Sequence, residues 1–113
     1  MLNSSTSVEE VLGSYLEQLA IELLSEIPLE KVTLVRGSEE LLRELILKAP
    51  TGTYRLTFGI DLTTNYEFWV SLKKVDDPKS FSAVDWGIKR IYKLPVLKLA
   101  EAVSKWTMSK VQV

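Results

Sequence analysis

The chain contains neither cysteine nor histidine. Their absence excludes disulfides, thiolate nucleophiles and the Ser-His or Cys-His pairs of covalent catalysis. Most zinc and transition-metal sites are excluded too, because cysteine and histidine are their usual ligands. The chain also lacks the side chain that most often changes its charge near neutral pH. We therefore expect no metal site and no other cofactor.

Amides and long apolar runs are also scarce. The only amide side chains are those of Asn3, Gln18, Asn65 and Gln112. Few amides beside abundant Lys and Glu are typical of thermophile proteins, although a short chain can reach this composition by chance. The uncharged apolar runs are far shorter than a membrane span, and residues 1–7 lack the basic-then-apolar layout of a signal peptide. We expect a cytoplasmic protein of a thermophile, with no membrane partner.

The rest of the composition is that of an ordinary globular domain. Of the 113 residues, 46% are hydrophobic and 26% are charged, which is enough for one modest core. The chain has no internal repeat, linker or low-complexity segment. We therefore expect residues 1–113 to form a single domain, with the Ser/Thr-rich residues 1–6 disordered.

Charge is distributed unevenly along the chain. Residues 1–44 hold nine acidic and three basic side chains, a net charge of −6, whereas residues 45–113 carry +5. The overall charge of −1 therefore conceals a gradient. Such a chain can present a basic surface to an anionic partner. Alternatively, the acids of one element pair with the bases of another, in the same subunit or in a neighbouring one.

An amphipathic helix is predicted for residues 8–26. Ser7 and Glu10 have the spacing of a capping box. Apolar residues recur at helical spacing as far as Ile27, and Pro28 ends the pattern. The apolar stripe is broad, so either it spans the whole core or part of it is buried against a second protomer. We expect a homodimer.

Strands are predicted where β-branched or alternating residues follow the helix. Residues 31–36, 53–61 and 66–74 have this character. Residues 39–49 fit either a helical stripe or a strand that leads into a turn at 50–52. We favour the strand, because a turn followed by another strand is typical of a hairpin.

The apolar faces of residues 53–61 and 66–74 predict how these two strands pair. On the core face, Phe58 is expected opposite Phe68, Leu56 opposite Val70, and Tyr54 opposite Leu72. On the other face, Thr57 is expected opposite Trp69, Arg55 opposite Ser71, and Gly59 opposite Glu67.

Two helices are predicted near the C-terminus. Ser80 or Ser82 caps a helix over residues 80–92, and Pro95 begins a last helix that ends near Ser109. The order of elements indicates an α+β, two-layer domain with an N-terminal helix, an antiparallel three- to four-stranded meander and C-terminal helices. The helices cover one face of the sheet, and the other face is open or covered by a second copy.

Trp69 lies outside the apolar register of its strand, so alternation places it on the second face among polar residues. A ring flanked by cations is suited to single-stranded nucleic acid, because the ring stacks on a base and the cations contact phosphates. Alternatively, Trp69 covers Gly59, or packs under the 80–92 helix or against a partner subunit.

The candidate nucleic-acid site joins this face to the densest basic stretch, residues 87–93. Its residues are Trp69, Arg55, Lys48, Lys73, Lys89, Arg90 and Lys93. The basic stretch is alternatively a solvated helix face. We expect non-enzymatic, sequence-tolerant binding of single-stranded nucleic acid across the sheet. The alternative is a homo-oligomeric interaction or structural module with no nucleic-acid ligand.

Acidic residues near turns are the remaining candidates for catalysis, namely Asp61, Asp76, Asp77 and Asp85. A nuclease-type magnesium site needs clustered carboxylates with a Lys at a fixed spacing, and the segment around Glu67 has no such Lys. The glycines are scattered, so there is no phosphate-binding loop. We expect that the protein is not an enzyme.

Overall fold

The computed structural model describes residues 8–29, 31–36, 41–61, 63, 66–88 and 90–111, and for residues 31–36 and 78 it describes the backbone only. Residues 1–6, which were predicted to be disordered, lie outside this part of the chain. The helices are α1 (Val8–Glu26), the 3₁₀ turn η2 (Ile91–Lys93) and α2 (Val96–Val111). The strands are β1 (Lys31–Arg36), β2 (Leu42–Ala49), β3 (Gly52–Asp61), β4 (Glu67–Lys74) and β5 (Asp77–Asp85).

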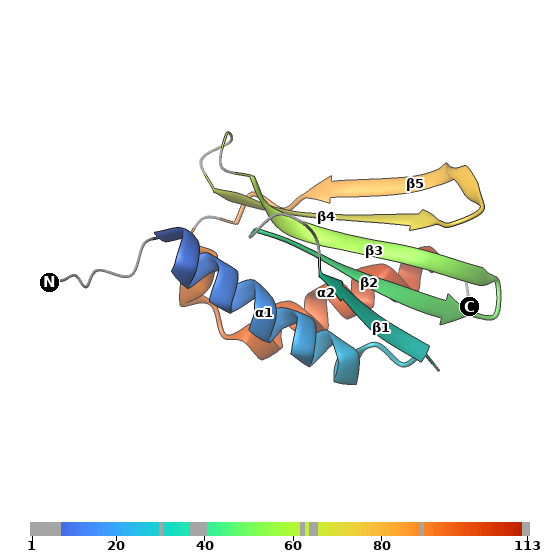
Figure 1. The fold of residues 1–113 in the computed structure, drawn as a ribbon, viewed down its shortest axis with the longest axis horizontal. Coiled ribbons are helices and arrows are strands. Elements are labelled where there is room, and N and C mark those ends of the chain that lie inside the picture. The colour runs from blue at the N-terminus through green and yellow to red at the C-terminus, as the bar shows by residue number, and fades with distance from the viewer. Residues whose placement is uncertain are drawn as a thin grey trace, which may run out of the picture.

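The strands form one antiparallel sheet in the order β1-β2-β3-β4-β5. The predicted α+β fold, with an N-terminal helix, an antiparallel meander and a C-terminal helix, is therefore confirmed. Figure 1 shows the strands fanned into a twisted sheet, with the two helices running along it. The sheet has five strands, where the sequence predicted three or four.

One hydrophobic core lies between the sheet and the helices. Leu16 and Leu19 of α1, Phe58 of β3, Phe68 of β4 and Val103 of α2 are all fully buried in it. The buried side chains of β3 and β4 alternate along each strand and so point to a single face. Both helices cover that face. We call the opposite face of β2 to β5 the outer face.

Residues 42–49 of the ambiguous segment form the strand β2, as favoured, and residues 39 and 40 lie outside the described residues. Leu45 and Leu47 of β2 are buried, while Ile46 is half-buried and Lys48 is exposed on the outer face. Helical propensity is overridden here, because pairing with β1 and β3 satisfies the backbone on both sides of β2. Lys48 lies opposite Thr53 of β3, six residues along β2 from Leu42, which is in line with Trp69. The predicted position of Lys48 beside Trp69 is therefore wrong.

The predicted register of β3 and β4 is wrong by two residues. Phe58 lies opposite Val70, not Phe68, and Gly59 lies opposite Trp69. The cause is Tyr66, which leaves the strand with φ 63° and donates its backbone N–H to the Asp61 carbonyl at 3.0 Å. The loop therefore includes Tyr66. A shift of two residues keeps every side chain on its predicted face.

The same shift changes the partners on the outer face. Thr57 faces Ser71, not Trp69, and Arg55 faces Lys73, not Ser71. Trp69 therefore has Gly59 directly opposite on β3.

The predicted helix over residues 80–92 is wrong. Residues 77–85 form β5, which pairs with β4, and of the residues that the structure describes between 80 and 93 only 91–93 are helical, as η2. The apolar spacing of Val84, Ile88 and Ile91 fits a helix. A strand paired with β4 is favoured over a helix here, because β4 would otherwise have an edge of unpaired N–H and C=O groups. Trp86 extends this pairing, because its backbone N–H donates to the Phe68 carbonyl at 2.9 Å.

A salt bridge fastens α1 to the sheet. Arg43 of β2 donates from Nε to the Glu17 carboxylate at 2.8 Å and from Nη2 to the Gly13 carbonyl at 3.3 Å. The Arg43 side chain is only 12% exposed. These directional bonds fix how α1 lies along β2, because Gly13 and Glu17 are one turn apart on the same side of α1.

A second polar cluster fastens α2 to the tip of the β2–β3 hairpin. The Val111 carbonyl accepts from the Thr51 hydroxyl at 2.8 Å and from the Tyr54 hydroxyl at 3.4 Å. The two hydroxyls are 2.8 Å apart. The carbonyl at a helix C-terminus has no partner within the helix, so the hairpin caps α2.

We expect Tyr54→Phe to lower the free energy of unfolding by about 0.5–1.5 kcal/mol, because it leaves the Thr51–Val111 contact without one partner. Tyr66→Phe is the matched control, since the Tyr66 side chain is 37% exposed in a loop, and should change stability by less than about 0.5 kcal/mol. Urea denaturation measures both. Equal losses for the two variants would contradict the capping role.

Candidate functional site

The outer face of the sheet carries four of the predicted site residues, Trp69, Arg55, Lys73 and Lys48. Strand pairing arranges its side chains in rows across the sheet. From one end to the other, the rows are Asp61–Glu67, Leu42–Gly59–Trp69–Asp85, Glu44–Thr57–Ser71–Ala83, Ile46–Arg55–Lys73 and Lys48–Thr53. Trp69 therefore lies one row from the end.

Trp69 is half-buried and lies against Gly59. A Cβ on Gly59 would be 3.1 Å from Cζ2 and 3.3 Å from Cε2 of the indole ring. It would also approach the Leu41 carbonyl oxygen more closely than real Cβ atoms do. Trp69 thus shields a backbone that has no side chain of its own, as one of the sequence-based alternatives proposed. Because Trp69 is half-buried, part of it remains accessible to solvent.

The charges of the outer face are separated along the strands. The acidic end comprises Asp61, Glu67, Asp85 and Glu44, and the cationic end comprises Arg55, Lys73 and Lys48. Trp69 is in the acidic end, with Asp85 opposite on β5 and Glu67 two residues away on the same face of β4. Lys73 is four residues along β4, or about 13 Å from Trp69.

The cations of this face are close to one another. Arg55 and Lys73 are directly opposite on β3 and β4, so two positive charges share one row. The Arg55 Nε lies 3.8 Å from the Glu44 carboxylate, which also accepts from the Thr57 hydroxyl at 3.2 Å. Glu44 therefore offsets part of the positive charge where the two ends meet.

The basic stretch after β5 belongs to another part of the molecule. Lys89 lies outside the described residues, and Arg90 and Lys93 flank or belong to η2. Ile91 of η2 is fully buried in the core, and η2 packs against α1. Arg90 and Lys93 are exposed, but they extend from the helical layer. Arg90 and Lys93 are therefore not part of the outer face that carries Trp69.

The acidic residues near turns stabilise those turns. Asp61 accepts from the Thr63 N–H at 2.9 Å, Asp77 from the Lys79 N–H at 3.1 Å, and Asp85 from the Gly87 N–H at 3.0 Å. These are Asx turns. Within the described residues, no group of three or more acidic side chains is placed to hold a metal ion.

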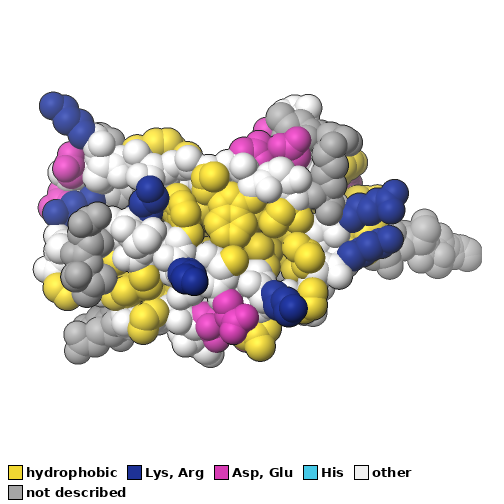
Figure 2. Space-filling model, turned by 180° about the vertical axis from the view of Figure 1, so that it is seen from behind, with side chains coloured by type: hydrophobic (Ala, Val, Ile, Leu, Met, Phe, Trp, Pro, Cys, Tyr) yellow, Lys and Arg dark blue, Asp and Glu magenta, His cyan; other side chains and the backbone are white. Residues whose placement is uncertain are grey.

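A strip of half-buried apolar residues beside α2 was not anticipated from the sequence. It comprises Val84, Trp86, Ile88 and Trp106. Trp86 packs edge-on against Phe68, with ring centroids 5.9 Å apart. Helix α1 packs against β1 and β2 and α2 packs against β4, so the inner side of β5, at the edge of the sheet, stays partly uncovered. Figure 2 shows apolar side chains gathered in the middle of the side where α2 lies, with charged side chains around them.

Alternation of Phe81, Ala83 and Asp85 with Ser82, Val84 and Trp86 is the sequence signal that identifies β5. Recognising it would have placed Asp85 beside Trp69.

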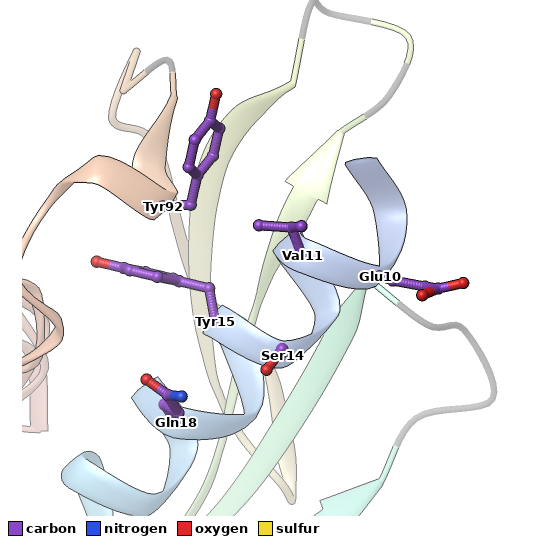
Figure 3. Close-up of a pocket in the computed structure, with 6 residues that line it drawn as sticks. All are labelled: Glu10, Val11, Ser14, Tyr15, Gln18 and Tyr92. Carbon is purple, nitrogen blue, oxygen red and sulfur yellow. The ribbon is translucent and has the colours of Figure 1, made fainter. Parts of the chain in front are cut away.

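A shallow hollow of about 340 Å³ lies between α1 and η2, lined by Glu10, Val11, Ser14, Tyr15, Gln18 and Tyr92. Figure 3 shows that Glu10 points away from the two tyrosines. The Tyr15 hydroxyl is engaged, since it donates to the Leu94 carbonyl at 2.9 Å. Burial raises the pKa of Tyr15 above its usual value of 10.0. The Tyr15 hydroxyl therefore has a structural role in the hollow, because it holds the segment that precedes α2.

Comparisons of the chain with protein-family models, curated proteins and solved structures gave no match. No helix within the described residues is long and apolar enough to cross a membrane. The geometry of the outer face therefore carries the functional argument.

We expect Gly59→Ala to destabilise the protein by about 1–3 kcal/mol, because the added Cβ meets the Leu41 backbone and the Trp69 ring. Adding Trp69→Ala should not restore stability, since the backbone contact remains. Ser71→Ala, on the same face, is the control and should change stability by less than about 0.5 kcal/mol. Thermal unfolding compares the variants. Full recovery in the double variant would show that the ring is the sole obstacle.

Stability should fall as the pH rises above about 10, in part because of Tyr15. With its pKa raised by burial, native Tyr15 keeps its proton where the unfolded chain has lost it. Its contribution is complete below pH 10 and is lost as the pH rises through the folded-state pKa. Urea denaturation between pH 8 and pH 11 should show a shallower decline for Tyr15→Phe than for the wild type. Parallel curves would contradict this assignment.

Proposed function

We propose that the protein is a non-enzymatic interaction module that binds a protein surface through the outer face of its sheet. The observation that carries this proposal is the surroundings of Trp69. Half-buried apolar side chains, Leu42, Ile46 and Trp69, share the face with charges of both signs. Apolar centres with mixed polar surroundings are typical of protein interfaces.

Nucleic acid is less well matched to this arrangement. A polyanion is attracted by unbroken positive charge along its path. A base stacked on Trp69 would place its phosphates near Asp85 and Glu67, whereas Lys73 is about 13 Å away along β4. The repulsion from these carboxylates opposes the stacking gain of roughly 1–3 kcal/mol for one base.

Single-stranded nucleic acid remains the second candidate because of one specific observation. Arg55 and Lys73 lie side by side on the same face as Trp69, and the Arg55 side chain is 51% exposed. Two adjacent cations on an open sheet can contact consecutive phosphates. In this alternative, Lys48 extends the cationic path toward the hairpin tip.

An oligonucleotide titration separates the two candidates. For a protein-binding face we expect no saturable quenching of tryptophan fluorescence by single-stranded DNA or RNA at low salt. Quenching that saturates, weakens with added salt, and disappears in both Trp69→Phe and Lys73→Glu would overturn the proposal in favour of nucleic acid. Trp106→Phe, which alters a tryptophan of α2, is the matched control and should behave like the wild type.

A further inference from the structure

The acidic and cationic ends make the outer face complementary to itself when one copy is reversed. All the acidic side chains of the rows lie on one side of a line between the Ser71 row and the Lys73 row, and all the cations lie on the other. A second copy turned end for end about the Ser71 row therefore brings the acids of the two rows at one end, Asp61, Glu67 and Asp85, over the cationic rows of the first. Glu44, in the row at the axis, meets its own counterpart and remains paired with Arg55 of its own chain. A copy in the same direction places like charges together.

We propose that a second copy of this chain covers the outer face in a two-fold, face-to-face stack of the two sheets. This inference rests on the proposed function and names its partner. The two-fold axis lies between the sheets and runs across the strands near the row that contains Thr57 and Ser71. Such an arrangement is isologous, so each contact occurs twice.

The axis determines which residues meet. The row of Trp69 and Asp85 in one copy lies over the row of Arg55 and Lys73 in the other. The exposed part of Trp69 then faces a cation, an arrangement that favours indole rings. Each Asp85 lies near a cationic row of the partner. Residues at the axis, such as Ser71, lie near their own counterparts, with the sheets about 10 Å apart.

The second copy is favoured over an unrelated partner by this charge pattern. A surface selected for one foreign protein needs to complement only that protein, and it has no reason to be divided into ends of opposite charge. Here the dividing line lies between the third and fourth of the five rows, next to the proposed axis at the Ser71 row. The half-buried Leu42, Ile46 and Trp69 lie on both sides of that line.

Charge reversal tests the orientation. We expect the wild type to be a dimer by sedimentation equilibrium. Lys73→Glu and Asp85→Lys should each weaken the dimer at least about tenfold, because each variant places like charges together twice. An equimolar mixture of the two variants should dimerise again, since the carboxylate introduced at position 73 of one copy then meets the ammonium group introduced at position 85 of the other. Lys98→Glu on α2 is the control and should leave the dimer unchanged.

Cross-linking tests the position of the axis, and the absence of cysteine makes each introduced thiol unique. Ser71→Cys should be joined to its counterpart by a short bis-maleimide. Gln18→Cys, exposed on α1, should not be. Circular dichroism confirms that each variant is folded, and the cross-linking result stands even if a charge-reversed variant is not.

The outcomes distinguish the inference from the proposed function. A wild type that is monomeric up to about 100 µM, or a dimer that cross-links through Gln18→Cys and ignores both charge reversals, overturns the second copy as partner. Neither result affects the proposed protein-binding face. Oligonucleotide binding at Trp69 overturns the proposed function, and with it this inference.

Discussion

The fold depends on burying one face of a sheet under two helices. Residues of β2, β3 and β4 alternate between that face and the outer one, so each strand contributes to the core with every second side chain. Leu56, Phe58 and Val70 are fully buried as a result. The alternate residues form the outer face. The core and the proposed interface are therefore two consequences of the same alternation.

Two polar fastenings orient the helices over the core. Hydrophobic burial is not directional, so it holds α1 and α2 against the sheet without defining their angle. The Arg43 bonds to Glu17 and Gly13 fix α1 along β2. The hydroxyls of Thr51 and Tyr54 fix the end of α2 at the hairpin tip.

Elements with strong local patterns were predictable from the sequence. The helix over residues 8–26 has the predicted bounds, because its apolar spacing and the proline after it are local signals. The register of β3 and β4 was not predictable, because it depends on the left-handed conformation of Tyr66. The strand β5 was not predicted, because the spacing of Val84 and Ile88 fits a helix as well as a strand. Only the free edge of β4, a tertiary feature, decides between them.

The candidate site shows the same limit. Alternation correctly put Trp69 on the face away from the helices, together with Arg55 and Lys73. Its immediate neighbours were wrong, because they depend on register and on β5. The charge count of residues 45–113 suggested a basic setting for Trp69. The pairing instead gives it Asp85, since charge along a chain does not translate into charge at a point in space.

The loop between β3 and β4 has a consequence for how this protein can vary. Its length determines how far β4 slides along β3, and the loop that includes Tyr66 moves the pairing by two residues from the predicted register. Because sides alternate with every residue, changes of two residues preserve which side chains are inside, whereas a change of one turns the strand over. Insertions and deletions that shift the register by an even number of residues are therefore better tolerated than those that shift it by an odd number. Those that survive leave the core intact and move Trp69 to a new neighbour, so partner preference can diverge while the fold is conserved.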